Sequence, residues 1–61
     1  MKVRDVVKLI ENDGWYLVRT RGSHRQYKHR SKPGLVTIPG TPGKELAIGT
    51  LNNILRQAGL R

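Results

Sequence analysis

The spacing of the apolar residues changes twice along this chain, and the change restricts the folds that it can adopt. Near the N-terminus, apolar residues recur every three or four positions, which predicts an amphipathic helix over residues 2–13. The middle of the chain is rich in aromatic and β-branched residues and predicts strands at residues 15–20, 24–29 and 35–38. Helical spacing then returns in a second amphipathic segment that starts near residues 48–50.

Glycine, proline and threonine mark the ends of these elements. Gly14 follows the first helix, Thr50 can cap the start of the second, and Gly59 closes it. The turn Arg21-Gly22-Ser23 is short enough to pair the first two strands as a hairpin. Pro33-Gly34 suits the central positions of a type II turn before the third strand.

The order of elements indicates the fold class. Burial is achieved most simply when both helices pack on one face of a three-stranded antiparallel sheet and the other face stays open to solvent. We therefore expect an α+β fold with the order α-β-β-β-α. A chain of 61 residues has room for one core, so we expect a single domain over residues 1–61.

The positive charge of the chain indicates what it binds. Twelve Lys and Arg against four Asp and Glu give a formal net charge of +8, which favours polyanions, with nucleic acid as the default and an acidic protein as an alternative. The cations are spread through strand-like segments, and no apolar run approaches the roughly 20 residues of a membrane span, so we expect no membrane partner. Without a signal-peptide pattern after Met1, we expect a cytoplasmic protein.

His24 stands beside the predicted hairpin turn and is the strongest candidate for chemistry. In a regular strand His24, Gln26 and Lys28 share one face, whereas Tyr27 turns its apolar ring toward the helices. His24 is then displayed on the open face among cations. An imidazole can accept a proton near neutral pH, so it can activate the 2′-hydroxyl of RNA for attack on the adjacent phosphorus. The products are a 2′,3′-cyclic phosphate and a free 5′-hydroxyl.

Basic side chains near His24 would stabilise charge on the phosphoryl oxygens. The residues that we expect to contact RNA are Arg19, Arg21, Ser23, Arg25, Lys28 and Lys44. For any single cation, ordinary solvated surface is the simpler interpretation. Ser23 has an alternative role too, since its hydroxyl can hold the turn by bonding the local backbone.

The sequence contains few other catalytic groups. His29 falls on the opposite side of a regular strand and is interpreted as a polar residue at the strand end. A lysine, an arginine or water must then protonate the leaving 5′-oxygen, and we expect a slow enzyme. No spacing gathers His and carboxylates as metal ligands, cysteine is absent, and no buried acid completes a triad with Ser23, so we expect no metal and no cofactor.

With these residues in view, the chain resembles the HicA family of type II toxin–antitoxin toxins, which are small mRNA interferases, over nearly its whole length. The matching segments are Asp13-Gly14-Trp15, Gly22-Ser23-His24 with Tyr27, Pro39, Lys44-Glu45-Leu46, and Gly49-Thr50-Leu51 leading into residues 54–60. The resemblance implies a fold like the double-stranded-RNA-binding domain, ribosome-independent cleavage of mRNA, and His24 as the catalytic histidine. One position departs from the pattern, because Thr41 stands where many relatives carry a second histidine.

The resemblance also implies a partner. An antitoxin of the HicB family would cover the active face, so the chain is expected to be a monomer alone and part of a hetero-oligomer with its antitoxin. In that complex, the antitoxin's own DNA-binding part would help to repress the shared operon.

Two alternatives to an endoribonuclease toxin stay open. A non-catalytic RNA-binding module would have the same charge, the same order of elements and the same open face. A DNA-binding subunit would read a groove with its last helix, whose apolar stripe the core already requires. The polar residues of that helix are Asn52, Asn53, Arg56, Gln57 and Arg61.

Overall fold

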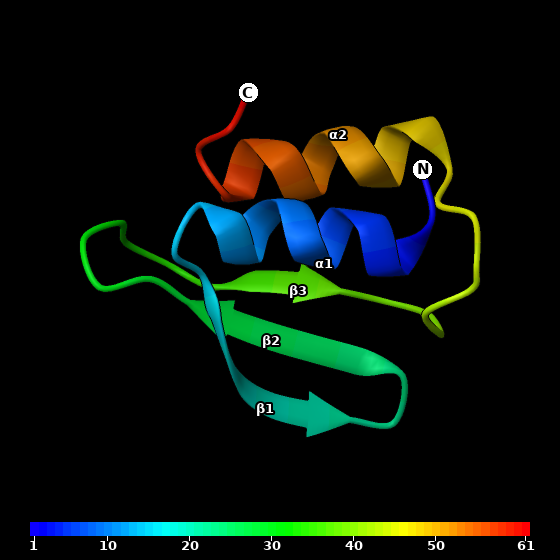
Figure 1. The fold of residues 1–61 in the computed structure, drawn as a ribbon, viewed down its shortest axis with the longest axis horizontal. Coiled ribbons are helices and arrows are strands. Elements are labelled where there is room, and N and C mark those ends of the chain that lie inside the picture. The colour runs from blue at the N-terminus through cyan, green and yellow to red at the C-terminus, as the bar shows by residue number, and fades with distance from the viewer.

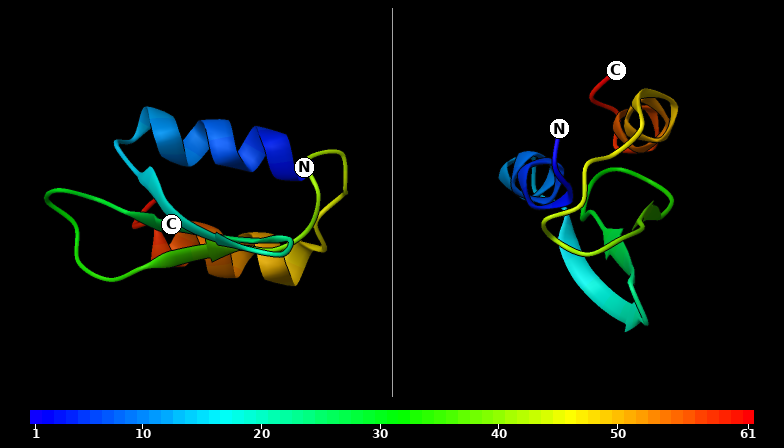
Figure 2. Two further views of the ribbon diagram at one scale, coloured as in Figure 1. Left: turned by 90° about the horizontal axis from the view of Figure 1, so that it is seen from below. Right: turned by 90° about the vertical axis from the view of Figure 1, so that its right-hand side faces the viewer.

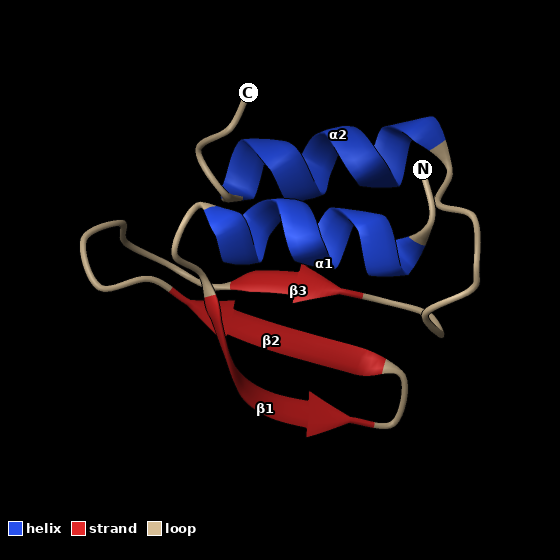
Figure 3. Cartoon of the chain, in the orientation of Figure 1, coloured by secondary structure: helices blue, strands red, loops and turns tan.

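The computed structural model describes all residues, 1–61. Its elements follow the chain in the order α1 (Val3–Asn12), β1 (Tyr16–Arg21), β2 (His24–Lys28), β3 (Val36–Ile38) and α2 (Ile48–Gln57) (Figure 1). The three strands form one antiparallel sheet in the order β1-β2-β3 (Figure 3). This arrangement confirms the predicted α+β class and the predicted order of helices and strands.

The two helices lie side by side, and the core sits between them and the β2–β3 half of the sheet (Figure 2). The Gln57 amide oxygen lies 3.5 Å from the backbone nitrogen of Thr37, which places α2 along the outer edge of β3. Strand β1 is farthest from the helices, and all six of its residues are exposed. The buried core residues are Val3, Val6, Ile10, Trp15, Tyr27, Val36, Ile38, Leu46, Ile54 and Ala58. Neither helix is long and apolar enough to cross a membrane.

The N-terminus of α1 is capped by a distant part of the backbone. Lys2 occupies the N-cap position, and its side chain makes no capping bond. The backbone N–H of Val3 instead donates to the carbonyl of Lys44 at 2.9 Å, and Lys2 and Glu45 form an antiparallel bridge. The N-terminal ammonium and the Glu45 carboxylate form an ion pair beside that bridge. The segment between β3 and α2 therefore satisfies the helix donors that usually need a capping side chain.

The ends of α2 differ in how well the sequence predicts them. The helix begins at Ile48, and its N-cap residue Ala47 offers no side-chain bond, so the prediction that Thr50 caps the helix is wrong. At the other end, Gly59 has a φ of 70° and the N–H of Leu60 donates to the carbonyl of Leu55 at 2.9 Å. This is the glycine-terminated helix end that the sequence predicts.

His29 ties the loop after β2 to the C-terminal end of α1. Its Nε2 lies 2.6 Å from the Asp13 carbonyl oxygen, and its Nδ1 accepts hydrogen bonds from the backbone N–H groups of Ser31 and Lys32 at 3.0 and 3.2 Å. A neutral imidazole with its proton on Nε2 satisfies all three contacts at once. The ring also meets Trp15 edge to face, with the centroids 5.3 Å apart. His29 is therefore a structural residue, in agreement with its interpretation as a polar strand-end residue.

Candidate functional site

The hairpin between β1 and β2 displays His24 at its turn. Arg21 and His24 are the last cross-strand pair, and Gly22 follows with a φ of 55°, as the first central position of a type II′ turn requires. Tyr27 is 2% exposed and faces the helices, so His24, three residues earlier in the same strand, faces away from them. The imidazole is exposed and makes no hydrogen bond within the chain.

We call the sheet surface opposite the helices the open face. Cross-strand partners share a face, so Arg21 joins His24, and Arg19 joins Gln26. Register in β3 adds Thr37, the partner of Gln26. The open face comprises Tyr16, Val18, Arg19, Arg21, His24, Gln26, Lys28, Leu35 and Thr37.

A β-bulge decides which β1 side chains reach the open face. Leu17 pairs with Tyr27, whereas the next pair joins Arg19 to Gln26 and leaves Val18 without a partner. Leu17 therefore shares the inner face with Tyr27, although regular alternation would put it on the same face as Arg19. The bulge turns Val18 outward beside Arg19, and nothing in the sequence indicates it.

No carboxylate lies on the open face. The four acidic residues are Asp5, Glu11, Asp13 and Glu45, and all lie on α1, at its end, or in the segment before α2. The hydrogen bond from Lys32, whose Nζ is 2.5 Å from the carboxylate, lowers the pKa of Asp13. The N-terminal ammonium lowers the pKa of Glu45 in the same way. The positive charges of Arg19, Arg21 and Lys28 are thus left without an acidic neighbour, which favours an anionic ligand.

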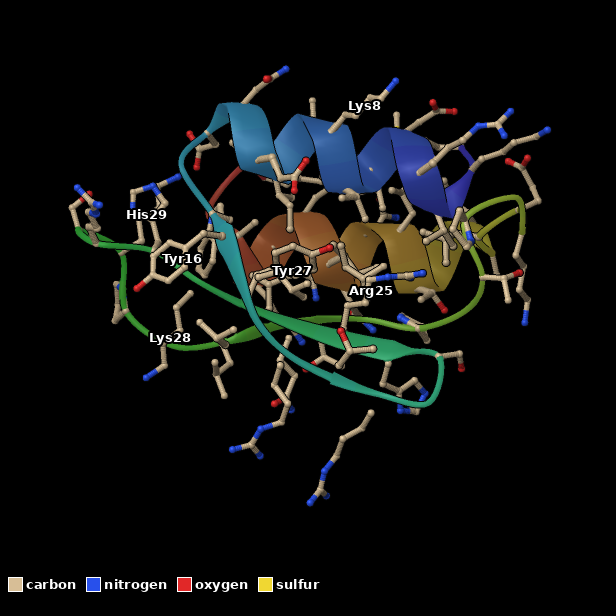
Figure 4. All side chains as sticks on the ribbon, turned by 60° about the horizontal axis from the view of Figure 1, so that its bottom comes forward. Lys8, Tyr16, Arg25, Tyr27, Lys28 and His29 are labelled. Carbon is tan, nitrogen blue, oxygen red and sulfur yellow. The ribbon has the colours of Figure 1, made fainter.

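Three other residues predicted to bind RNA lie off this face or at its border. Arg25 points to the inner face, where its guanidinium donates to the carbonyl of Gly40 at 2.9 Å (Figure 4). Lys44 packs its aliphatic chain against Gly40, in the segment before α2. Ser23 is exposed in the turn, and its hydroxyl makes no hydrogen bond to the backbone. The structure therefore groups Arg19, Arg21 and Lys28 with His24 and leaves Arg25 and Lys44 apart.

A hollow of about 280 Å³ opens in the same face. Its lining residues are Val18, Arg19, Gln26, Lys28 and Leu35. Gln26 follows His24 by two residues in β2, so the hollow adjoins the imidazole. Three of these residues were not predicted as site residues: Val18, Gln26 and Leu35. Strand alternation could have indicated Gln26. No sequence signal marks the bulge that brings Val18 to the hollow.

The polar residues of α2 are engaged with one another and with the chain end. Arg61 donates to the side-chain oxygen of Asn52 at 2.5 Å, and Arg56 donates to that of Asn53 at 3.3 Å. Ile54 and Ala58 of the same region are buried in the core. These contacts leave α2 with few free groups to read a DNA groove.

The comparison with protein families identifies the family of the chain. The model of the family described as HicA toxin of bacterial toxin–antitoxin matches residues 3–60. The chain belongs to the HicA toxin family. A search of curated proteins gives no match. The matched span includes both helices, the sheet and every residue of the open face, so the HicA assignment covers the site together with the fold.

The HicA-family chain has one imidazole that a ligand can reach on the open face. His24 is exposed there, whereas both ring nitrogens of His29 are occupied by backbone groups. Thr41, the position at which the sequence departs from the expected pattern, lies in a turn closed by a 3.0 Å bond from the Lys44 N–H to its carbonyl. No three His, Cys, Asp or Glu side chains come together as a metal site. His24 is therefore the single histidine on this face whose ring nitrogens are free to meet a ligand.

Proposed function

We propose that this HicA-family chain is a metal-independent endoribonuclease toxin that cleaves mRNA, with His24 as the general base. The observation that supports this proposal is the exposure of His24 on an open face that carries cations and no carboxylate. The ribose and phosphate of a single strand can approach such a face without steric obstruction from the helices. Because mRNA is its substrate, the toxin acts in the cytoplasm.

The proposed reaction uses the nucleophile that RNA itself provides. His24 accepts the proton of the 2′-hydroxyl, and the 2′-oxygen attacks the adjacent phosphorus. The bond from phosphorus to the 5′-oxygen breaks, which leaves a 2′,3′-cyclic phosphate and a 5′-hydroxyl. Arg21, the cross-strand partner of His24, stabilises the charge that builds up on the phosphoryl oxygens. Since His29 is held in its structural contacts, a lysine, an arginine or water protonates the leaving oxygen, and turnover is slow.

The test replaces His24 with alanine and compares cleavage of a single-stranded RNA by the two purified proteins. We expect the variant to lose about 10²- to 10⁴-fold in rate, the typical contribution of a general base. DNA of the same sequence serves as the control substrate, because it lacks the 2′-hydroxyl and should remain intact. Unchanged RNA cleavage by a correctly folded His24→Ala protein would place the catalyst elsewhere.

A non-catalytic RNA-binding module is the second candidate, and the lack of another free imidazole on the open face favours it. Gel electrophoresis of RNA incubated with the pure protein separates the two functions. A binding module retards the RNA bands, whereas a nuclease shortens them. Retardation alone, even at high protein concentration, would establish the binding module.

Membership of the HicA family indicates a toxin–antitoxin pairing. We propose that the partner is a HicB-like antitoxin, that the toxin is a monomer by itself, and that the two form a hetero-oligomer in which the antitoxin covers the open face. An acidic surface on the partner would match the cations of this face. Coexpression with the product of the adjacent gene tests this, and an open face that stays accessible in the complex would contradict it.

A further inference from the structure

The hollow of the open face has the dimensions and the lining of a site for one nucleobase. Its volume of about 280 Å³ is close to the lower end of small-molecule sites, which begin near 300 Å³. A hollow of this size has room for a single flat ring. We propose that it binds one base of single-stranded RNA next to the scissile phosphate, and that Gln26 selects this base; the inference rests on the function proposed above.

The lining supplies each kind of contact that an unstacked base uses. Val18 and Leu35 provide apolar surface for the ring. The guanidinium plane of Arg19 can stack on it, as arginine does with bases of single-stranded RNA. Lys28 at the rim can hold the neighbouring phosphate as a point charge.

Gln26 is the residue of the hollow that can distinguish one base from another. A side-chain amide carries both a donor and an acceptor, and glutamine forms bidentate pairs with base edges. The amide makes no hydrogen bond within the chain, and the residue is half-buried between Arg19 of β1 and Thr37 of β3. Its side chain is therefore flanked by neighbours that limit its freedom, while its polar end stays available.

The position of the hollow relates base selection to the site of cleavage. His24 and Gln26 are two residues apart in one strand and on one face, so their Cα atoms are separated by roughly 7 Å. Neighbouring nucleotides of an extended single strand have a similar spacing. A base in the hollow thus belongs to a nucleotide directly adjacent to the phosphate that His24 serves.

The β1 bulge is part of this site. It turns Val18 onto the open face beside Arg19, where a regular strand would turn it toward the helices. Without that turn the hollow would lose an apolar wall. Bulges next to active sites often redirect a side chain in this way.

The experiment measures binding in the absence of cleavage. The full chain carrying His24→Ala is titrated with short fluorescent homopolymers of A, C and U ribonucleotides, and anisotropy gives the dissociation constants. We expect the three RNAs to bind with unequal affinities. Adding Gln26→Met should weaken the binding of the preferred RNA by about 5- to 10-fold, which is toward the lower end of the discrimination that one bidentate pair provides. Methionine has a similar length without the amide, and Gln26→Ala provides a second variant should methionine disturb the fold.

Two further variants distinguish base selection from general effects. Asn53→Ala removes an exposed side-chain amide from α2, away from the open face, and should leave the order of affinities unchanged. Lys28→Gln should weaken all three RNAs alike and reduce the slope of log affinity against log salt by about 0.7, as expected for one lost phosphate contact to a single strand.

The experiment distinguishes a failure of the base site from a failure of the ribonuclease. If the wild-type protein cleaves RNA and both Gln26 variants keep the same cleavage sites and the same order of affinities, the hollow does not select a base and the inference is refuted. If no RNA is cut but the Gln26 variants lose the base preference, the ribonuclease fails while the base site stands in a binding module. Equal affinities for the three homopolymers in the His24→Ala protein would also refute base selection.

Discussion

His29→Ala should destabilise the fold and leave the chemistry of the remaining folded molecules intact. The ring takes part in three contacts with backbone groups, from Asp13, Ser31 and Lys32, and one edge-to-face contact with Trp15. A hydrogen bond contributes about 1 kcal/mol to stability, and an aromatic pair contributes about 0.5–1.5 kcal/mol. Together these contacts predict a loss of about 4 kcal/mol. A domain of this length is stabilised by only about 3–9 kcal/mol, so the loss is a large fraction of the total.

Urea denaturation followed by circular dichroism measures this loss, and the midpoint should shift without a change in the slope. RNA cleavage is then measured in the same preparation and divided by the folded fraction. We expect the rate per folded molecule to stay within about twofold of the wild type, which is a change of only about 0.4 kcal/mol in the activation barrier. His24→Ala is the matched control, because it should reduce cleavage by about 10²- to 10⁴-fold and leave the unfolding midpoint unchanged.

A His29→Ala protein with normal stability and strongly reduced cleavage would refute this reasoning. It would mean that His29 leaves its backbone partners and donates the proton to the leaving 5′-oxygen. The enzyme would then have an acid and a base, and the expectation of slow turnover would be lost as well.

Two further predictions concern the hairpin turn and the ion pairs. Gly22→Ala places a Cβ on a residue with a φ of 55°, and no atom beyond the neighbouring residues lies within 4 Å of that Cβ. The variant should therefore lose about 1–2 kcal/mol of stability through backbone strain alone. A larger shift of the urea midpoint would indicate a steric clash. Acid should destabilise the fold, because the pKa values of Asp13 and Glu45 are lower in the folded chain than their ordinary values of 3.8 and 4.5. The unfolded chain therefore binds protons more readily than the folded chain. The stabilisation that these carboxylates give above their ordinary pKa values is lost as the pH falls below those values. Asp13→Asn should reduce this pH dependence of the urea midpoint, and an unchanged profile would show that the ion pair with Lys32 does not contribute.

The sequence by itself determined the order of the elements, the face on which His24 lies and the family. These properties depend on patterns within a few residues. Apolar residues repeat every three to four positions in the helices and every two positions in the strands. Gly14 and Gly59 end the helices. Tyr27 is the apolar residue of β2, so its burial determines which face of the strand His24 occupies. The net charge depends on composition alone.

Only the tertiary structure decided which side chains from outside β2 join His24. Leu17 and Arg19 are separated onto opposite faces by the register of β1 against β2, and Arg25 is drawn to the carbonyl of Gly40, 15 positions away. His29 finds its partner in Asp13, 16 positions away. Each of these outcomes depends on how distant segments pack, because a polar group moves to whichever partner the packed chain brings within hydrogen-bond distance. No local pattern encodes that partner, and for this reason the hollow beside His24 is a property of the folded chain.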